Sequence, residues 1–317
     1  MRMPLEPKSK FVLDQINAVE LPPLETLTAE QLRASQSLPR NQDAEPVGKV
    51  ENRTIPGPAG DLPVRVYYPK ELQSSHPGLV YFHGGGWVIG DLDSHDSVCR
   101  ALTNHANCVT ISVDYRLAPE HKFPAAVEDA YASVQYVHDH AEEFQIDPAR
   151  IAIGGDSAGA TLSAVVTNLA KQDNGPALCY QVLFYPSTAA GVDTPTVSSV
   201  ENGEGYFLTS GLMDWFMNCY LNNKEEKQSP LVTPMFFEDL TGLPPAIVIT
   251  AEYDPLRDEG EAYAEKLKEA GVEVECIRFD GTIHGFVSMS QVIDFGKDAL
   301  EKAGKGLANA FNKTLTK

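Results

Sequence analysis

A Gly-Asp-Ser-Ala-Gly pentapeptide at residues 155–159 has the composition and spacing of a turn that presents a nucleophilic serine. It follows the short apolar run 151–153 and precedes a helical pattern that begins near Ala158. On so tight a strand-to-helix turn, the flanking glycines leave room for neighbouring backbone, and the serine oxygen stands exposed above the sheet. The start of the helix also directs backbone N–H groups toward developing negative charge. We therefore predict that Ser157 is a nucleophile.

A second glycine-rich segment, His-Gly-Gly-Gly-Trp at residues 83–87, directly follows a strand-like apolar run. Consecutive glycines let successive backbone N–H donors approach a substrate oxygen closely. Such a loop acts together with the N–H group of the residue after the nucleophile. We predict that the N–H groups of Gly84, Gly85 and Ala158 form an oxyanion hole and that His83 anchors the loop. The segment lacks the Gly-Lys-Ser/Thr ending of a phosphate-binding loop.

A nucleophilic serine needs a base, and only one histidine, His284, follows Ser157 in the chain. After a serine turn of this kind, the acid and then the histidine follow along the chain. His284 lies in a loop after a strand-like run, where it can reach back over the edge of the sheet. Asp254 follows the apolar residues 246–250 at the carboxyl end of a strand, where open α/β sheets place their sites. We predict a catalytic triad of Ser157, Asp254 and His284.

Two other carboxylates compete with Asp254 for the role of the acid. Asp258 is interpreted as the N-cap of a helix that opens at Glu259. Asp280 is too close to His284 in sequence to come from a separate strand end. Asp254 is favoured because Pro255 turns the chain out of the strand directly after it.

The segments that must position these residues alternate between strand-like and helix-like patterns. Short strand-like runs lie at residues 78–82, 109–113, 151–153, 182–185, 246–250 and 272–279, and helical patterns lie at 97–106, 124–140, 158–172, 258–270 and 291–313. Residues 50–55 and 62–68 flank a turn-rich joint, which predicts an antiparallel hairpin. The alternation predicts an α/β fold with a mostly parallel sheet and helices on both faces.

Four further sequence blocks accompany the two glycine-rich segments in a fixed order. They are Asp-Tyr-Arg-Leu-Ala-Pro-Glu at 114–120, Phe-Pro-Ala-Ala at 123–126, Asp-Pro-Leu-Arg-Asp at 254–258 and His-Gly-Phe at 284–286. In these blocks the chain resembles the hormone-sensitive-lipase-like family of α/β-hydrolase carboxylesterases, also called bacterial esterase family IV, from about residue 50 to the C-terminus.

The resemblance implies an α/β-hydrolase fold, with a core sheet of about eight strands and a mainly helical cap. It also implies hydrolysis of short- to medium-chain carboxylic esters by a serine esterase that uses no metal or organic cofactor. A homodimer formed through the last strand is a further expectation from the family. The partners implied are thus a small-molecule ester and a second copy of the chain, with no nucleic acid and no membrane.

The expected cap has two parts, the polar, proline-punctuated residues 1–45 and an inserted segment at 187–225. The core then comprises residues 46–186 and 226–317. Thr28 is a candidate N-cap in the first part, and residues 212–217 of the second predict an amphipathic helix. Candidate residues of an acyl pocket are Trp87, Met213, Trp215, Phe216 and Met217. Packing of the cap explains the last four equally well.

Several charged residues near these motifs are interpreted as structural. Asp114, Arg116 and Glu120 are expected to fix the geometry of their loop through ion pairs. Asp156, inside the pentapeptide, is expected to bond nearby backbone.

The overall composition excludes some classes of function. The chain has 317 residues, is 43% hydrophobic and carries a formal net charge of −19. A nucleic-acid binder draws its affinity from Lys and Arg on phosphates, so this charge disfavours that class, and it also disfavours anionic membrane surfaces. The length suits a large α/β core with additional segments.

Cysteine usage and the first residues bear on the compartment. The five cysteines are scattered, with no Cys-x-x-Cys pair, which favours free thiols in a reducing compartment. Residues 1–7 carry proline and charge where a signal peptide needs an apolar run, and no stretch approaches ~20 apolar residues. We expect a cytoplasmic protein.

Two alternatives from other classes stay open. A non-catalytic ligand receptor on the same fold would keep the pocket and lose part of the triad. Another acyl hydrolase, such as an amidase or a sugar deacetylase, would keep the triad and differ in pocket geometry. A lipase that acts on long-chain emulsions is disfavoured, because the cap segment is not strongly apolar.

Overall fold

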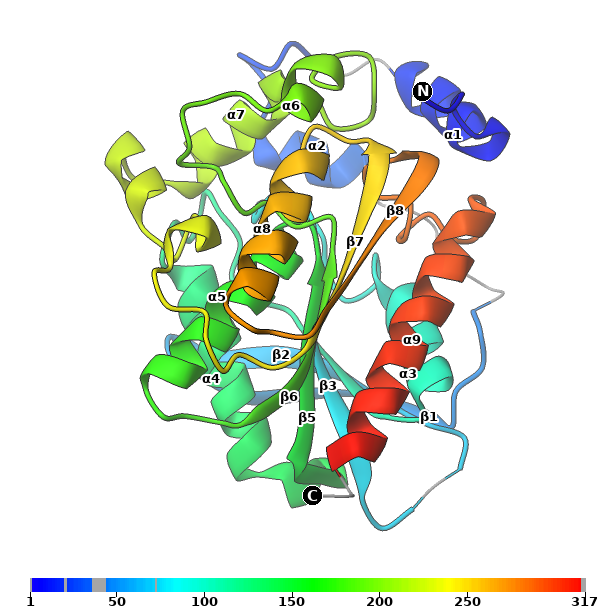
Figure 1. The fold of residues 1–317 in the computed structure, drawn as a ribbon, viewed down its shortest axis with the longest axis vertical. Helices are drawn as coiled ribbons and strands as arrows, with labels where there is room; N and C mark the ends of the chain where they lie inside the picture. The colour runs from blue at the N-terminus through cyan, green and yellow to red at the C-terminus, as the bar shows by residue number, and fades with distance from the viewer. Residues whose placement is uncertain (1, 20–21, 36–43, 72, 315–317) are drawn as a thin grey trace.

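The computed structural model describes residues 2–19, 22–35, 44–71 and 73–314. Their strands form one eight-stranded sheet in the order β1-β2-β4-β3-β5-β6-β7-β8 (Figure 1). The strands are β1 (Lys49–Gly57), β2 (Gly60–Tyr68), β3 (His76–Phe82), β4 (Val109–Val113), β5 (Ile146–Asp156), β6 (Leu178–Phe184), β7 (Ala246–Tyr253) and β8 (Val274–Ile283). The predicted sheet of about eight strands is confirmed.

The sheet is parallel except at one edge. β1 and β2 form the predicted hairpin, and β2 runs antiparallel to β4. The remaining neighbours, from β4 through β3, β5, β6 and β7 to β8, all pair in parallel. Parallel strands need helical crossovers and become buried on both faces, which explains why β3, β4 and β7 consist entirely of buried residues.

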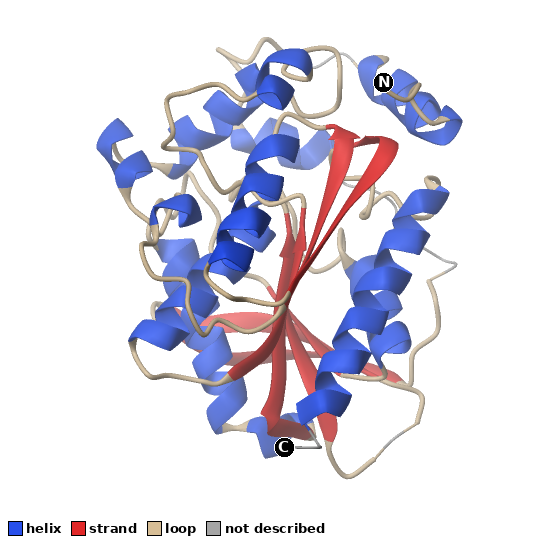
Figure 2. Ribbon diagram, viewed as in Figure 1, coloured by secondary structure: helices blue, strands red, loops and turns tan. Residues whose placement is uncertain are grey.

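Helices cover both faces of the sheet (Figure 2). The longer helices of the core are α3 (Asp96–Ala106), α4 (Ala125–Asp139), α5 (Ala158–Gln172), α8 (Arg257–Glu269) and α9 (Asp294–Thr314). α3 and α9 lie on one face, whereas α4, α5 and α8 lie on the other (Figure 1). Alternate residues of β3 face opposite ways, so Val80 joins one apolar core and Leu79 the other.

The helices outside this core lie beyond the carboxyl ends of the parallel strands (Figure 1). They are α1 (Pro7–Asn17), α2 (Ala29–Ser35), α6 (Val197–Glu201), α7 (Ser210–Tyr220) and the short 3-10 helix η2 (Lys224–Gln228). The 3-10 helix η3 (Pro234–Phe236) instead lies beside α8, whose Lys266 Nζ donates to the Met235 carbonyl at 2.7 Å. A further 3-10 helix, η1 (Ala141–Phe144), precedes β5. Of the expected cap segment 1–45, residues 1, 20–21 and 36–43 lie outside the described residues.

The local signals in these outer helices are confirmed. Thr28 accepts a bond from the Gln31 N–H at 3.2 Å, and the Gln31 side chain accepts one from the Thr28 N–H at 3.0 Å. This reciprocal pair is a capping box. The amphipathic stretch 212–217 lies within α7, whose Phe216 and Tyr220 are buried in the same apolar core as Leu27.

Among the described residues, no helix combines the length and the apolar character that a membrane crossing requires. All five cysteines are free thiols. Cys99 and Cys108 are fully buried, and burial raises the pKa of Cys108 to about 12.

The loop that follows β4 corrects one expectation. Arg116 pairs with the buried Asp129, with bonds of 2.8 Å from both Nε and Nη2, and Glu120 pairs with Arg33 at 2.8 Å. Asp114 forms no ion pair within the described chain, so its predicted part in the loop's ion pairs is wrong. Burial, with the neighbouring charges of Asp91 and Asp93, raises the pKa of Asp114 to about 6.

Replacing this carboxyl changes how stability depends on pH. Folding raises the pKa of Asp114 from its ordinary value of 3.8 to about 6. The contribution of this carboxyl to stability is therefore complete below pH 3.8 and is lost as the pH rises through about 6. Asp114→Asn carries no such titration. The melting temperature of the variant relative to the parent should therefore rise between about pH 4 and pH 7. The exposed Asp298→Asn is the control, and a constant difference across this range would contradict the prediction.

Candidate active site

Ser157 occupies a strained turn between β5 and α5. Its φ of 52° lies in the left-handed region, which non-glycine residues rarely adopt. A Cβ on Gly159 would lie 1.9 Å from the carbonyl oxygen of Phe82, and one on Gly155 would lie 2.4 Å from the carbonyl carbon of Gly159. Only glycine fits at these positions, which explains the spacing of the pentapeptide. The Ser157 N–H donates to the Phe184 carbonyl at 2.8 Å.

The structure brings the three predicted triad side chains together. His284 Nε2 lies 2.9 Å from Ser157 Oγ, and His284 Nδ1 lies 2.6 Å from Asp254 Oδ2. A carboxylate only accepts hydrogen bonds, so Nδ1 carries the proton and Nε2 is free to accept from the serine hydroxyl. Asp254 is fully buried and His284 nearly so, while Ser157 is partly exposed.

The acid is held by the turn that follows β7. Asp254 Oδ1 accepts the Leu256 N–H at 2.8 Å, which leaves Oδ2 directed at His284. Asp254 and His284 each come one residue after the last register pair of β7 and β8, Tyr253↔Ile283. The ends of two neighbouring strands therefore place the Asp254 carboxylate beside the His284 imidazole.

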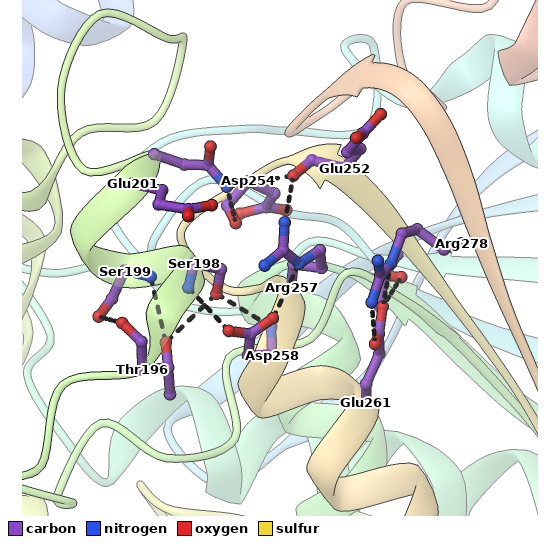
Figure 3. Close-up of polar contacts among 12 residues, drawn as sticks. Thr196, Ser198, Ser199, Glu201, Glu252, Asp254, Arg257, Asp258, Glu261 and Arg278 are labelled. Carbon is purple, nitrogen blue, oxygen red and sulfur yellow. Dashed lines mark hydrogen bonds and ion pairs between the residues drawn. The ribbon is translucent and has the colours of Figure 1, made fainter. Parts of the chain in front are cut away.

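Neither of the two competing carboxylates bonds His284. Asp258 Oδ2 accepts the N–H of Ser198 in α6 at 2.7 Å, and Oδ1 accepts Arg257 Nε at 2.8 Å (Figure 3). α8 begins at Arg257, so Asp258 lies inside its first turn and the expected N-cap role is wrong. Asp280 is exposed.

The glycine loop departs from the expectation at its first glycine. The Gly84 N–H donates to Asp156 Oδ1 at 3.0 Å in the protein interior, so it is not available to a substrate oxygen. The N–H groups of Gly85, Gly86 and Ala158 have no acceptor among the described residues. The expectation that the Gly84 N–H faces a substrate oxygen is thus wrong, because the buried Asp156 accepts this first N–H of the loop.

Asp156 is the centre of a buried polar cluster beneath the loop. It also accepts the Tyr81 hydroxyl at 2.8 Å and lies 3.1 Å from His95 Nε2. Although burial opposes ionisation, His95 and these hydrogen bonds hold the pKa of Asp156 below its ordinary value. The expectation that Asp156 bonds nearby backbone is confirmed at Gly84.

His83 behaves as a fixed part of the loop. Its Nδ1 lies 2.8 Å from the Gly84 carbonyl, and its ring stacks on Tyr115 at 4.4 Å between centroids. The Tyr115 hydroxyl donates to the His83 carbonyl at 2.8 Å. Burial, with the nearby His95, lowers the pKa of His83 to about 4. A neutral, fully enclosed ring of this kind fits the predicted anchor.

α7 lies directly against the glycine loop. A Cβ on Gly86 would lie 2.3 Å from Phe216 Cγ, so the Phe216 ring covers this glycine. The Trp87 ring stacks on Tyr220 at 4.5 Å, nearly parallel at 6°. Of the candidate pocket residues, Trp87 and Phe216 therefore lie at the loop that carries the free N–H donors.

The other three candidates point to packing between the outer segments. Trp215 Nε1 donates to the Leu27 carbonyl at 3.2 Å, which ties α7 to the N-terminal segment. Met217 is buried in the apolar core, and Met213 packs against that core while partly exposed.

Two residues beside the triad escaped the sequence reasoning. The Tyr185 ring packs on the His284 ring at 4.7 Å between centroids, and its φ of 36° is again left-handed. Glu259 Oε1 accepts the Thr188 N–H at 2.7 Å, and burial raises the pKa of this carboxyl to about 7. For Tyr185, the only sequence signal is the proline that follows it at the end of the predicted strand 182–185. No local sequence signal points to Glu259.

Comparisons with known proteins agree with the motif blocks. Residues 79–288 match a protein family that is described as having the alpha/beta hydrolase fold. The chain is 43% identical to carboxylesterase NlhH of Mycobacterium tuberculosis, over 82% of this chain and 81% of that protein. It is 38% identical to an arylesterase of Saccharolobus solfataricus, over 90% and 93% of the two chains. A hyperthermophilic esterase from the archaeon Pyrobaculum calidifontis, a solved structure, is 41% identical with a TM-score of 0.90, covering 97% of this chain and 99% of that one. The resemblance inferred from sequence is confirmed.

The contact between Asp156 and Gly84 can be tested without a substrate. Asp156→Ala leaves the buried Gly84 N–H without an acceptor, which should cost about 1–3 kcal/mol of unfolding free energy. The loop should also lose its orientation, so that a fluorophosphonate labels Ser157 about tenfold more slowly. Asp156→Asn keeps one oxygen for Gly84 and is the matched control. Equal labelling rates for the parent and the alanine variant would refute this role.

Proposed function

This chain belongs to the α/β hydrolase family, and from that premise we propose that it hydrolyses carboxylic esters through an acyl-enzyme formed on Ser157. The observation that carries the proposal is the hydrogen-bonded line from Ser157 through His284 to Asp254, beside backbone N–H groups that have no acceptor in the described chain. The relatives named a carboxylesterase and an arylesterase support esters as the substrate class.

The proposed chemistry follows from the direction of the hydrogen bonds. His284 Nε2 takes the Ser157 proton as Oγ attacks the ester carbonyl carbon, and then gives that proton to the departing alcohol. Water repeats the sequence on the acyl-enzyme and releases the acid. Asp254, which accepts from Nδ1, keeps the imidazole in the required tautomer and stabilises its charged form.

The negative charge that develops on the carbonyl oxygen is proposed to be held by Gly85, Gly86 and Ala158. Ala158 is the first residue of α5, so its N–H belongs to the unpaired donors of a helix start. Donors that are already oriented stabilise such charge without reorganisation, and removing one costs ~10²–10³ in rate.

The division of the chain remains a proposal as well. We propose that residues 1–45 and 187–225 form the cap, and that 46–186 and 226–317 form the hydrolase core. The packing of Phe216 on Gly86 supports a cap that encloses the acyl side of the site. Short- to medium-chain acids are proposed as the acyl groups, in line with the family.

Removing the nucleophile tests the central claim. Since the triad acts as a unit, Ser157→Ala should lower kcat for p-nitrophenyl butyrate by about 10⁶. The measurement is the initial rate of p-nitrophenol release by purified protein. The parent should cleave the butyrate ester faster than the palmitate ester.

Ser94→Ala is the matched control for this experiment. Ser94 Oγ also lies 2.9 Å from a histidine nitrogen, Nδ1 of His95, yet it is exposed and outside the proposed triad. This variant should keep most of the parent's activity. Near-normal turnover by Ser157→Ala would overturn the proposal, and an inactive parent would favour the receptor alternative.

We also propose that two copies associate through β8. β8 ends the strand order, so its outer edge has no strand partner within the described chain. Antiparallel pairing centred on Phe279 would bring Arg278 of one copy opposite Asp280 of the other, on the same face of the joined sheet. Opposite charges on directly opposed residues favour such pairing, and an exposed edge is a template for it.

Reversing one charge tests the association. Arg278→Glu would oppose two acidic residues across the two-fold axis, so the variant should sediment as a monomer where the parent sediments as a dimer. Lys297→Glu, on the exposed side of α9, is the control and should leave the dimer intact. A monomeric parent would overturn this part of the proposal.

A reducing, cytoplasmic compartment is proposed from the thiols alone. All five cysteines are free, and proteins of oxidising compartments commonly pair theirs. Fractionation of the producing cells is the measurement that decides this.

A further inference from the structure

The strand pair that carries the acid and the histidine is irregular just before both residues. The parallel ladder of β7 and β8 breaks after Ala251↔Phe279 and resumes at Tyr253↔Ile283. Glu252 alone therefore lies opposite three residues of β8. Bulges are rare between parallel strands, and they concentrate beside active sites, where they re-aim a side chain.

The alignment of the triad depends on this irregular stretch. Asp254 and His284 follow the resumed pair directly, and their hydrogen bond is 2.6 Å long. A slip of one residue in β8 would turn its side chains to the opposite face of the sheet. Something must therefore fix the extra residues of β8.

The Glu252 side chain binds the middle of the bulge. Its Oε2 accepts the Gly281 N–H at 2.7 Å, in place of a carbonyl from the neighbouring strand. Its Oε1 accepts the Met3 N–H at 3.0 Å. Glu252 is 5% exposed, so these bonds are shielded from water. A buried carboxylate with two backbone donors is a strong tie between segments.

Residues 2–6, which we name the N-terminal strap, bind the same bulge from outside. The Glu6 N–H donates to the Gly281 carbonyl at 2.9 Å, so both backbone groups of Gly281 are satisfied. The Tyr253 hydroxyl donates to the Met3 carbonyl at 2.5 Å. Gly281 has a φ of +75°, and a Cβ there would lie 2.9 Å from the Pro4 carbonyl oxygen, so only glycine fits beneath the strap.

The backbone of Glu252 is fixed from the other side. Arg257 Nη1 donates to the Glu252 carbonyl at 3.1 Å (Figure 3). Asn202, buried at the end of α6, donates from Nδ2 to the carbonyls of both Glu252 and Asp254 at 3.1 Å. The Glu252 carbonyl thus accepts two hydrogen bonds, which fix the backbone from which the carboxylate extends.

We propose that Glu252 is a positioning residue that locks the register of β8 at its bulge and thereby holds the His284 imidazole against Asp254. The predicted effect of Glu252 on turnover rests on the proposed esterase function. Glu252 does not touch the reacting atoms, and it acts only through Gly281 and the loop that leads to His284.

Two substitutions separate the acceptor from the charge. Glu252→Leu offers no acceptor to Gly281, so kcat for p-nitrophenyl butyrate should fall about 10- to 100-fold, while KM changes by less than about twofold. Glu252→Gln keeps one oxygen for the Gly281 N–H and turns its NH₂ toward the Met3 N–H, so only the bond to the strap is lost. This conservative variant should restore kcat to within about threefold of the parent.

A spectroscopic readout makes the test independent of turnover. The proton in the short bond between His284 Nδ1 and Asp254 gives a low-field proton NMR resonance. That resonance should be present in the parent and in Glu252→Gln, and should be shifted or lost in Glu252→Leu. Glu252→Ala is measured beside it, with the same expectation, so that the test stands if the leucine variant does not fold.

Glu269→Leu, an exposed position at the end of α8, is the control and should change neither readout. Parent-like kcat and resonance in both Glu252→Leu and Glu252→Ala would overturn the proposal. So would equal losses in Glu252→Gln and Glu252→Leu, because the amide still serves Gly281. An inactive parent with an intact low-field resonance would count against the esterase function and not against the register lock.

Discussion

The contact between the start of α5 and the end of β3 is the constraint on which the site depends. The Phe82 carbonyl oxygen lies where a Cβ of Gly159 would be, so the helix rests directly on the backbone of the neighbouring strand. Ser157, two residues earlier, has a left-handed φ of 52°, and the N–H of Ala158 at the helix start lies beside the glycine loop without an acceptor in the described chain. Residues 83–86 follow Phe82 directly, so the contact that fixes the turn of Ser157 also places the N–H donors of the glycine loop beside it.

Much of the fold and the triad could be predicted because the signals are local. The strand-like run Val-Thr-Ile-Ser-Val at 109–113 predicted β4 with the same bounds, and the glycines at 155 and 159 could be explained by a turn of a single type. His284 was identifiable since it is the only histidine after Ser157. Parallel strands end at one edge of the sheet, so residues that follow different strands converge there without any further information.

The remaining details depend on partners that sequence does not reveal. Gly84 was expected to donate to a substrate, but the carboxylate of Asp156, at the end of the neighbouring strand β5, takes that N–H. Arg116 pairs with Asp129 in α4, and Asp114 forms no ion pair within the described chain. Tyr185 lies against His284 because of a backbone conformation that propensities do not favour. In each case the outcome depends on a side-chain partner or a backbone conformation that the local sequence pattern does not encode.

The chain has two tryptophans, and both take part in contacts of α7. Trp87 stacks on Tyr220 of α7, and Trp215 of α7 bonds the Leu27 carbonyl ahead of α2. Indole emission depends on solvent exposure and on ring contacts, so separation of these helices from the glycine loop would alter both environments. Intrinsic tryptophan fluorescence therefore reports on the packing of α7 without an attached dye.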